Sequence, residues 1–240
     1  MFYIRIADLC VQIINQYEYV RLICEDYIVD APNTPPDLSV SVTQEQIEAE
    51  LVDSPPNTRV DYAEGVCMYR NICKQLPSML DAYLLHCAVI EYEGKGYAFA
   101  AKSGTGKSTH IALWQKRFGD CVRIVNGDKP ILRFIDNELY AYGTPWCGKE
   151  AYQTNTSVPL KAICFLERDS KNSISPITAG EAVMRIFHQI LTPKDIQEVD
   201  ALFPLLDRTL KTVPCYLLKC NISEEAAEVA YWGMNEKKEG

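Results

Sequence analysis

Residues 86–110 read HCAVIEYEGKGYAFAAKSGTGKSTH. The apolar run HCAVIEY, the glycine-containing segment EGKG and a second apolar run, GYAFAA, predict two strands joined by a tight turn. The second run enters the loop AKSGTGKSTH directly, and IALWQKRFG then has the apolar spacing of a helix that ends at Gly119. The stretch therefore predicts a strand, a glycine loop and a helix in immediate succession.

The glycine loop almost matches the phosphate-binding pattern G-x-x-x-x-G-K-[ST], with Ala101 at the first glycine position. We expect this small side chain to be tolerated, because glycines and the helix N-terminus direct the N–H groups that bind phosphate. Lys107 would contact the β- and γ-phosphates, and the Ser108 hydroxyl would bind magnesium. The predicted nucleotide-binding residues are Ser103, Gly104, Thr105, Gly106, Lys107, Ser108 and Thr109.

Two segments further along the chain carry candidate site residues. Asp128 follows the strand-like VRIVNGD, where a carboxylate can hold Mg²⁺, although Gly-Asp followed by Lys-Pro is also turn chemistry. The segment YGTPWCGKE, residues 142–150, contains Lys149, which could contact phosphate, and Glu150, which could accept a proton or bind metal. The alternative for this segment is a rigid surface turn around Trp146.

Three isolated residues have both a functional and a structural interpretation, and a fourth has only a structural one. Arg168, after AICFLE, could neutralise charge on a transferred phosphoryl group or could be a solvated strand end. His110 could approach the phosphates or face solvent, whereas His188 is interpreted as structural. His86 opens the first strand, where a single histidine is usually structural.

The remaining pattern predicts an α/β fold with a mixed sheet. After the loop helix come a strand (VRIVNGD), a hairpin turning at Asp136-Asn137 and a long apolar strand (VPLKAICFLER). The helical AGEAVMRIFHQIL, a helix over roughly 194–210, the strand PCYLLKC and the helical SEEAAEVAYWGM follow. This core is expected to span residues 61–240, beginning with a helix that Asp61 can cap and that Pro77 ends or kinks.

Residues 1–60 are expected to form a small β-rich part that packs on the core or covers its site. MFYIRIADLCVQII and YEYVRLICEDYIV are interpreted as strands, and LSVSV alternates with the period of a strand. Two proline-rich breaks, at 30–37 and 53–58, separate these runs.

Composition narrows the class of protein. The 240 residues carry a net charge of −8 without a basic stripe, which argues against nucleic acid as a partner. No apolar run reaches the roughly 20 residues that cross a bilayer, and no signal-peptide pattern is visible, so a cytoplasmic protein is expected. Ten cysteines lie mostly within apolar runs, which favours reduced, buried thiols over disulfides or zinc.

The segment HCAVIEYEGKGYAFAAKSGTGKST resembles the region around the phosphate loop of HPr kinase/phosphorylase. The core SGTGKST is also similar to the loop of ATP-dependent phosphoenolpyruvate carboxykinase, which shares that fold. The resemblance covers roughly residues 84–170, and the whole chain looks most similar to small bacterial HPr serine kinase-like proteins. It implies ATP and Mg²⁺ as ligands, with Lys107 and Ser108 in the roles above, and places His86 near the active site.

At one position this sequence differs from the HPr kinase pattern. Asp128 aligns with the second residue of an Asp-Asp pair in HPr kinases, and Gly127 aligns with the first, the family's general base. Either Glu150 or His110 would then take the hydroxyl proton, or the protein does not phosphorylate a serine in the manner of that family. No HPr-binding signature is recognisable, and the oxaloacetate-binding arginines of the carboxykinase cannot be placed.

The predicted function is ATP- and Mg²⁺-dependent phosphoryl transfer to a hydroxyl of a protein, peptide or small molecule. The alternative is a nucleotide-sensing or partner-binding module without transfer activity, which Gly127 motivates; a plain ATPase is a third, weaker hypothesis. A homo-oligomer is conceivable, since HPr kinases assemble as hexamers. The predicted catalytic residues are Lys107, Asp128, His86, Glu150 and Lys149, and the predicted metal ligands are Ser108 and Asp128.

Overall fold

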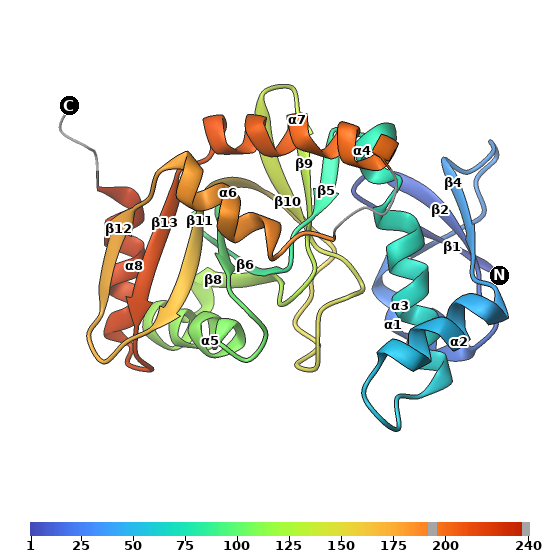
Figure 1. Ribbon diagram of the computed structural model, residues 1–240, viewed down its shortest axis with the longest axis horizontal. Helices are drawn as coiled ribbons and strands as arrows, with labels where there is room; N and C mark the ends of the chain where they lie inside the picture. The colour runs from blue at the N-terminus through green and yellow to red at the C-terminus, as the bar shows by residue number, and fades with distance from the viewer. Residues whose placement is uncertain (192–195, 237–240) are drawn as a thin grey trace.

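The computed structural model describes residues 1–191 and 196–236 and contains two β-sheets (Figure 1). The smaller sheet has the strand order β3-β1-β2-β4, and the larger has β5-β9-β10-β11-β7-β6-β8, with β13 beside β11 and β12 beside β13. The strands of the smaller sheet are β1 (Phe2–Ile6), β2 (Leu9–Ile14), β3 (Ile28–Val29) and β4 (Leu38–Ser41). Those of the larger sheet are β5 (Ala82–Leu84), β6 (Cys87–Tyr92), β7 (Lys95–Ala100), β8 (Val122–Asn126), β9 (Ile131–Ile135), β10 (Glu138–Tyr142), β11 (Ser157–Arg168), β12 (Ser173–Pro176) and β13 (Cys215–Cys220).

The larger sheet is mixed, as the sequence predicts. The long strand β11 runs parallel to β7 and β13, while β6 pairs antiparallel with both β7 and β8. Consequently the loop after β7 and the end of β8 lie at the same edge of the sheet, next to the start of β6. This edge is where the candidate site lies.

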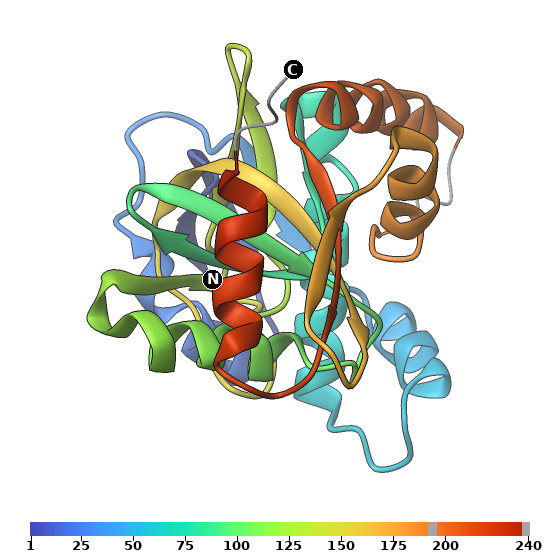
Figure 2. The same ribbon diagram turned by 90° about the vertical axis from the view of Figure 1, so that its left-hand side faces the viewer.

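Helices cover both faces of the larger sheet (Figure 2). The helices α5 (Lys107–Phe118) and α8 (Glu225–Asn235) lie on one face, and α6 (Ala179–Phe187) and α7 (Ile196–Thr212) lie on the other. Phe99 packs with Trp114 of α5 on the first face, and Val89 and Ala98 join the core cluster beneath α6 and α7. Strands buried on both faces explain the nearly continuous apolar runs of this region. No helix within residues 1–191 and 196–236 is long and apolar enough to span a bilayer.

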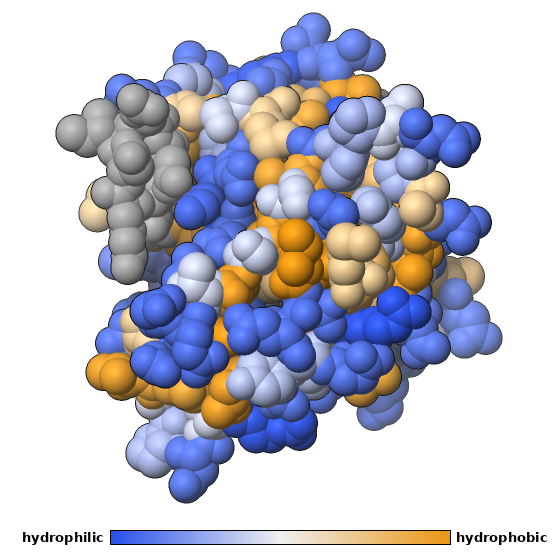
Figure 3. Space-filling view, turned by 90° about the vertical axis from the view of Figure 1, so that its right-hand side faces the viewer, coloured by the Kyte–Doolittle hydropathy of each residue, from blue (hydrophilic) through white to orange (hydrophobic). Residues whose placement is uncertain are grey.

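The N-terminal sheet packs against α1 (Glu18–Ile23), α2 (Gln44–Asp53) and α3 (Val60–Cys73), and the short α4 (Leu76–Met79) follows. Val11, Ile47 and Met68, from the sheet, α2 and α3, are fully buried in one cluster. The same cluster includes Ile131 and Trp146 of the core, so the two parts share apolar packing. The side of the molecule that carries this sheet is shown in Figure 3, where hydrophilic residues surround a broken central band of apolar ones.

Several local predictions for the N-terminal part are wrong. YEYVRLICEDYIV is mostly the helix α1 and a 3₁₀ turn (Glu25–Tyr27), and only Ile28–Val29 is a strand. Residues 1–14 form a hairpin of two strands rather than one, because Ala7 and Asp8 adopt positive φ angles of 45° and 66°. The helix α2 was not predicted, although Thr43 and Gln46 form a capping box at its start.

The start of α3 also differs from the prediction. Arg59 is the N-cap, no side chain caps the helix, and Asp61 lies within its first turn, where it pairs with Arg59. Pro77 does not end α3, which stops at Cys73; it lies in the first turn of α4. Of the helix predicted over roughly 194–210, residues 194–195 lie outside the described residues, and α7 covers the rest.

Candidate functional site

The loop between β7 and α5 has the backbone conformation that its glycines permit. Gly104 and Gly106 have φ angles of 77° and 128°, where a side chain would be strained. Gly106 is the N-cap of α5, and no side chain caps the first turn of this helix. The N–H groups of that turn are therefore available to an anion, and the helix dipole favours one.

Arg168, at the end of β11, donates hydrogen bonds to carbonyl oxygens of this loop. Its Nε donates to the Thr105 carbonyl oxygen at 2.9 Å, and a terminal nitrogen donates to the carbonyl oxygen of Gly104. Arg168 is exposed at the end of β11, as the strand-end interpretation expects, and it does not line the cavity that the loop faces. Neither interpretation anticipated its contacts with the loop carbonyls. It fixes the conformation of the glycine loop.

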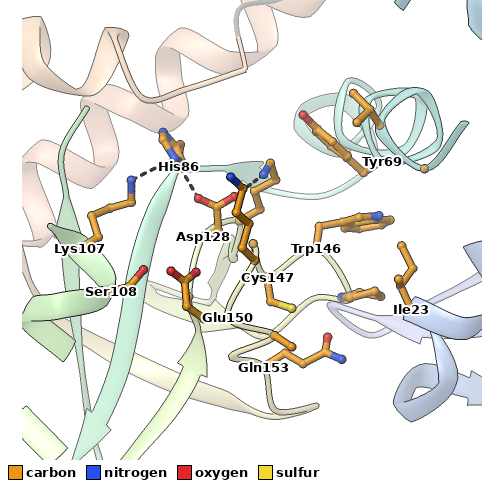
Figure 4. Close-up of a pocket in the computed structure, with 18 of the residues that line it drawn as sticks. Ile23, Tyr69, His86, Lys107, Ser108, Asp128, Trp146, Cys147, Glu150 and Gln153 are labelled. Carbon is orange, nitrogen blue, oxygen red and sulfur yellow. Dashed lines mark hydrogen bonds and ion pairs between the residues drawn. The ribbon is translucent and has the colours of Figure 1, made fainter. Parts of the chain in front are cut away.

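A chain of polar contacts joins Lys107, His86 and Asp128 (Figure 4). The Lys107 Nζ lies 3.0 Å from the His86 Nε2 and 3.2 Å from the Ala101 carbonyl oxygen. The His86 Nε2 lies 2.9 Å from the Asp128 Oδ1, and Lys129 pairs with the Oδ2 of the same carboxylate. His86 stands just before β6 and Asp128 just after β8, so the antiparallel pairing of these strands brings them together.

The two lysines at this cluster differ in their electrostatic environment. Burial lowers the pKa of Lys107, and the attraction of Asp128 only partly offsets it. Burial would also lower the pKa of Lys129, but its ion pair with Asp128 raises it overall. Burial alone would raise the pKa of Asp128, yet the hydrogen bond from His86 and the charge of Lys129 hold it well below its usual value. Asp128 thus forms its ion pair with Lys129, and Lys107 is a buried cation that forms no ion pair with a carboxylate of the described residues.

Gln189, just after α6, determines the tautomer of His86. With its nitrogen toward the imidazole, the Gln189 amide donates to the His86 Nδ1 at 3.0 Å and to the Ala101 carbonyl oxygen at 3.0 Å. The opposite orientation would set the amide oxygen against carbonyl oxygens. Because Nδ1 accepts, the proton of a neutral His86 lies on Nε2 and is donated to Asp128. The Lys107 ammonium, which is also a donor, therefore gains no hydrogen bond from this nitrogen and donates to the Ala101 carbonyl oxygen.

These residues face a cavity of about 1070 Å³. The segment 145–151 forms one side of it, and the carboxylate of Glu150 points into the space between Ser108 and Asp128 (Figure 4). Lys149 is exposed at the same opening. The structure thus brings together the predicted catalytic and metal-binding residues, which are Lys107, Asp128, His86, Glu150, Lys149 and Ser108, with Ser103, Gly104, Gly106 and Thr109. Thr105 does not line this cavity and borders a neighbouring one instead.

His110, the second candidate base, lies in the core rather than at the cavity or in solvent. Its Nε2 accepts a hydrogen bond from the Trp114 Nε1 at 3.1 Å, and its ring packs edge-on against Phe99. Burial lowers the pKa of His110 to about 3, so the ring is a poor base at neutral pH. His188 follows α6 and does not line the main cavity.

The available oxygen ligands fit magnesium better than a metal that needs a complete protein cage. Within residues 1–191 and 196–236, no group of three or more His, Cys, Asp or Glu side chains could hold a metal ion. The Ser108 hydroxyl and the Asp128 carboxylate are hard oxygen donors, and Mg²⁺ is typically held by one or two carboxylates together with phosphates and water. These two residues could hold Mg²⁺ when a phosphorylated ligand supplies the other oxygens.

Two residues of the cluster were missed in the sequence. Lys129 follows Asp128 directly, and such a neighbouring opposite charge was a usable signal. Gln189 lies far along the chain, and nothing in its surroundings marks it; a β-bridge between Leu85 and Ile190 brings it to His86.

Comparison with known proteins assigns the chain to a family. The family model described as "SynChlorMet cassette protein ScmC" matches residues 66–231, and the chain belongs to this family. A solved structure, the Hpr(Ser) kinase/phosphatase from Coxiella burnetii, is distantly similar, with 11% identity and a TM-score of 0.37 over 64% of this chain and 99% of that one. No curated protein matches the sequence.

Proposed function

We propose that this ScmC-family protein binds Mg²⁺ and ATP at residues 103–109 and transfers the terminal phosphoryl group to a hydroxyl of a protein, peptide or small molecule. One observation carries the proposal. Lys107 is a buried ammonium at an uncapped helix N-terminus, beside a glycine loop, and its pKa is lowered because no carboxylate of its own compensates its burial. A phosphate group would supply the missing negative charge.

The remaining roles follow from position. Lys107 and the N–H groups of the first turn of α5 would hold the β- and γ-phosphates, and Ser108 and Asp128 would hold Mg²⁺. Bound magnesium would neutralise part of the triphosphate charge. His86 keeps the Asp128 carboxylate in place through its Nε2–H. Catalysis then rests mostly on positioning and charge stabilisation.

Glu150 is the better of the two candidate bases. Its carboxylate points into the cavity between the two proposed metal ligands, whereas His110, on α5 itself, is buried against Phe99 and Trp114. An acceptor hydroxyl that enters beside Asp128 would meet Glu150, which would take its proton. Lys149, next to it at the opening, would contact phosphate.

One observation favours the alternative, a nucleotide-sensing module without transfer activity. A Cβ at Gly127 would lie 3.0 Å from the Cys147 carbonyl oxygen and 3.1 Å from the Tyr152 Cβ. At the position that aligns with the HPr kinase base, even a Cβ is therefore crowded. A protein that binds nucleotide but never labels an acceptor would fit this alternative.

A transfer assay separates the two. Wild type, Lys107→Ala and Lys95→Ala are each incubated with γ-labelled ATP, Mg²⁺ and a desalted bacterial extract plus its small-molecule fraction. Lys95→Ala is the matched control, because Lys95 is exposed at the opposite end of β7. Label on one acceptor with wild type and Lys95→Ala, but not with Lys107→Ala, is expected. Turnover by Lys107→Ala at the wild-type rate would refute the proposal.

A further inference from the structure

The cavity extends well beyond the proposed nucleotide site. Past Trp146 it reaches the helices α1 and α3 of the N-terminal part. Ligand pockets usually measure about 300–1,000 Å³, so a cavity of about 1070 Å³ has room for a second molecule beside a nucleotide. We call this extension the aromatic arm; its apolar lining is formed by Tyr19, Ile23, Tyr62, Val66, Tyr69 and Trp146.

Aromatic rings form the walls of the arm. Tyr69 and Trp146 lie 5.7 Å apart, centroid to centroid, and Tyr19 and Tyr62 lie 6.2 Å apart. Gly65 lies between these pairs in the interior of α3, a position where glycine is unfavourable for the helix. A Cβ there would lie 3.4 Å from the Tyr19 ring, at van der Waals contact, so a side chain larger than alanine at this position would project against the walls of the arm.

The outer end of the arm is acidic. Glu25 and Asp26 line it and are exposed, and neither has an ion-pair partner within the described part of the chain. Their turn is fixed to the core, because the Asn155 side-chain amide donates to the Asp26 carbonyl oxygen at 2.9 Å. Two unpaired carboxylates held beside an aromatic surface suit a cationic group.

We propose that the aromatic arm binds the phosphoryl acceptor, and that the acceptor is a peptide segment with an apolar side chain near its hydroxyl residue and Lys or Arg farther away. This inference rests on the proposed function. Tyrosine and tryptophan are the residues that dominate protein recognition surfaces, and the acidic rim complements basic side chains. The serine or threonine oxygen forms a bond to the γ-phosphorus. The bond between that phosphorus and the bridging oxygen breaks, and its electron pair stays on the departing ADP. Glu150 takes the hydroxyl proton.

An oriented peptide library tests the inference. Peptides with one fixed serine and randomised flanks are incubated with γ-labelled ATP, Mg²⁺ and the full-length protein. The wild type is expected to select apolar residues beside the serine and Lys or Arg farther away. Glu25→Gln with Asp26→Asn should weaken only the basic preference, about three- to ten-fold, because exposed ion pairs contribute modestly. The control, Asp53→Asn with Asp120→Asn, makes the same change in charge outside the cavity and should alter nothing.

A second variant tests the apolar part of the arm. Gly65→Leu fills it, so the apolar preference should disappear while the ATP dissociation constant changes by less than about two-fold; ATP binding also reports whether this variant folds. Gly65→Ala, a smaller change, should reduce the preference only in part. Unchanged selection in these variants, or selection for acidic peptides, overturns the inference.

The library result also separates this inference from the function on which it rests. If no peptide is labelled but a small molecule in the extract is, the peptide acceptor is wrong and the kinase stands. If nothing is labelled although ATP binds, both the kinase and the peptide acceptor are wrong.

Discussion

The substitution Asp128→Asn measures how strongly the ion pair at the site supports the fold. The side chains of Asp128 and Lys129 are 19% and 23% exposed, so the pair is mostly removed from water. Removing one partner of a buried pair costs about 3–5 kcal/mol, and removing an exposed pair costs about 0–1 kcal/mol. For this intermediate burial we expect a loss of about 2–3 kcal/mol, or about 4–12 °C in Tm for a chain of this length.

A second substitution distinguishes the ion pair from a general disturbance. Asp128→Asn with Lys129→Met removes the unpaired ammonium and should recover most of the lost stability in urea unfolding. Neither variant keeps the carboxylate that would hold Mg²⁺, so neither should be stabilised by Mg²⁺ and ATP as the wild type is. If Asp128→Asn unfolds at the wild-type urea concentration, or if Lys129→Met rescues nothing, the reasoning about this pair is wrong.

Substitutions at three further positions test other parts of the site. Folding lowers the pKa of Lys107, so the unfolded chain keeps this proton to higher pH than the folded protein does. The free energy of unfolding should therefore rise with pH up to about 10.4. In thermal unfolding measured across pH, Lys107→Met should flatten this rise without lowering Tm at pH 7. Arg168→Ala removes two hydrogen-bond donors that hold the loop carbonyls and should weaken ATP binding about ten-fold, as calorimetry would measure. An unchanged ATP affinity with a lower transfer rate would mean that Arg168 acts on the phosphoryl group instead. Gly127→Asp should destabilise the protein by about 1–3 kcal/mol in urea unfolding, and Gly127→Ala by a similar amount, because the crowding is already at the Cβ; an active, stable aspartate variant would contradict this.

The sequence specified the larger sheet better than the N-terminal part, and the reason is physical. Strands such as β7 and β11 are buried on both faces, so their apolar runs are long and unambiguous. The helix α1 is only six residues long and contains Tyr19, Val20 and Ile23, which favour strands in isolation. Packing against α3 makes this segment helical, and a single sequence does not show that contact.

The candidate site was predictable where it depends on local sequence. The glycine loop and its lysine are contiguous, and Asp128 follows a recognisable strand, so their places in the fold could be predicted from the sequence. The contact of Arg168 with the loop, the hydrogen bond of Gln189 to His86 and the burial of His110 depend on how distant segments pack. From residue type alone, Arg168 was either a phosphoryl contact or a solvated strand end, and His110 was a candidate base. The structure places the Arg168 guanidinium at the loop carbonyls and the His110 ring in the core.

The departure at Gly127 and the placement of Glu150 are two aspects of one arrangement. The Gly127 N–H donates to the Tyr152 carbonyl oxygen at 2.8 Å, and Cys147 approaches so closely that even a Cβ at position 127 is crowded. This close approach holds the segment 145–151 over the end of β8 and brings the Glu150 carboxylate to the cavity. An aspartate at position 127 would displace the segment and the carboxylate with it. The close packing at Gly127 and the position of Glu150 at the cavity therefore depend on the same placement of the segment 145–151.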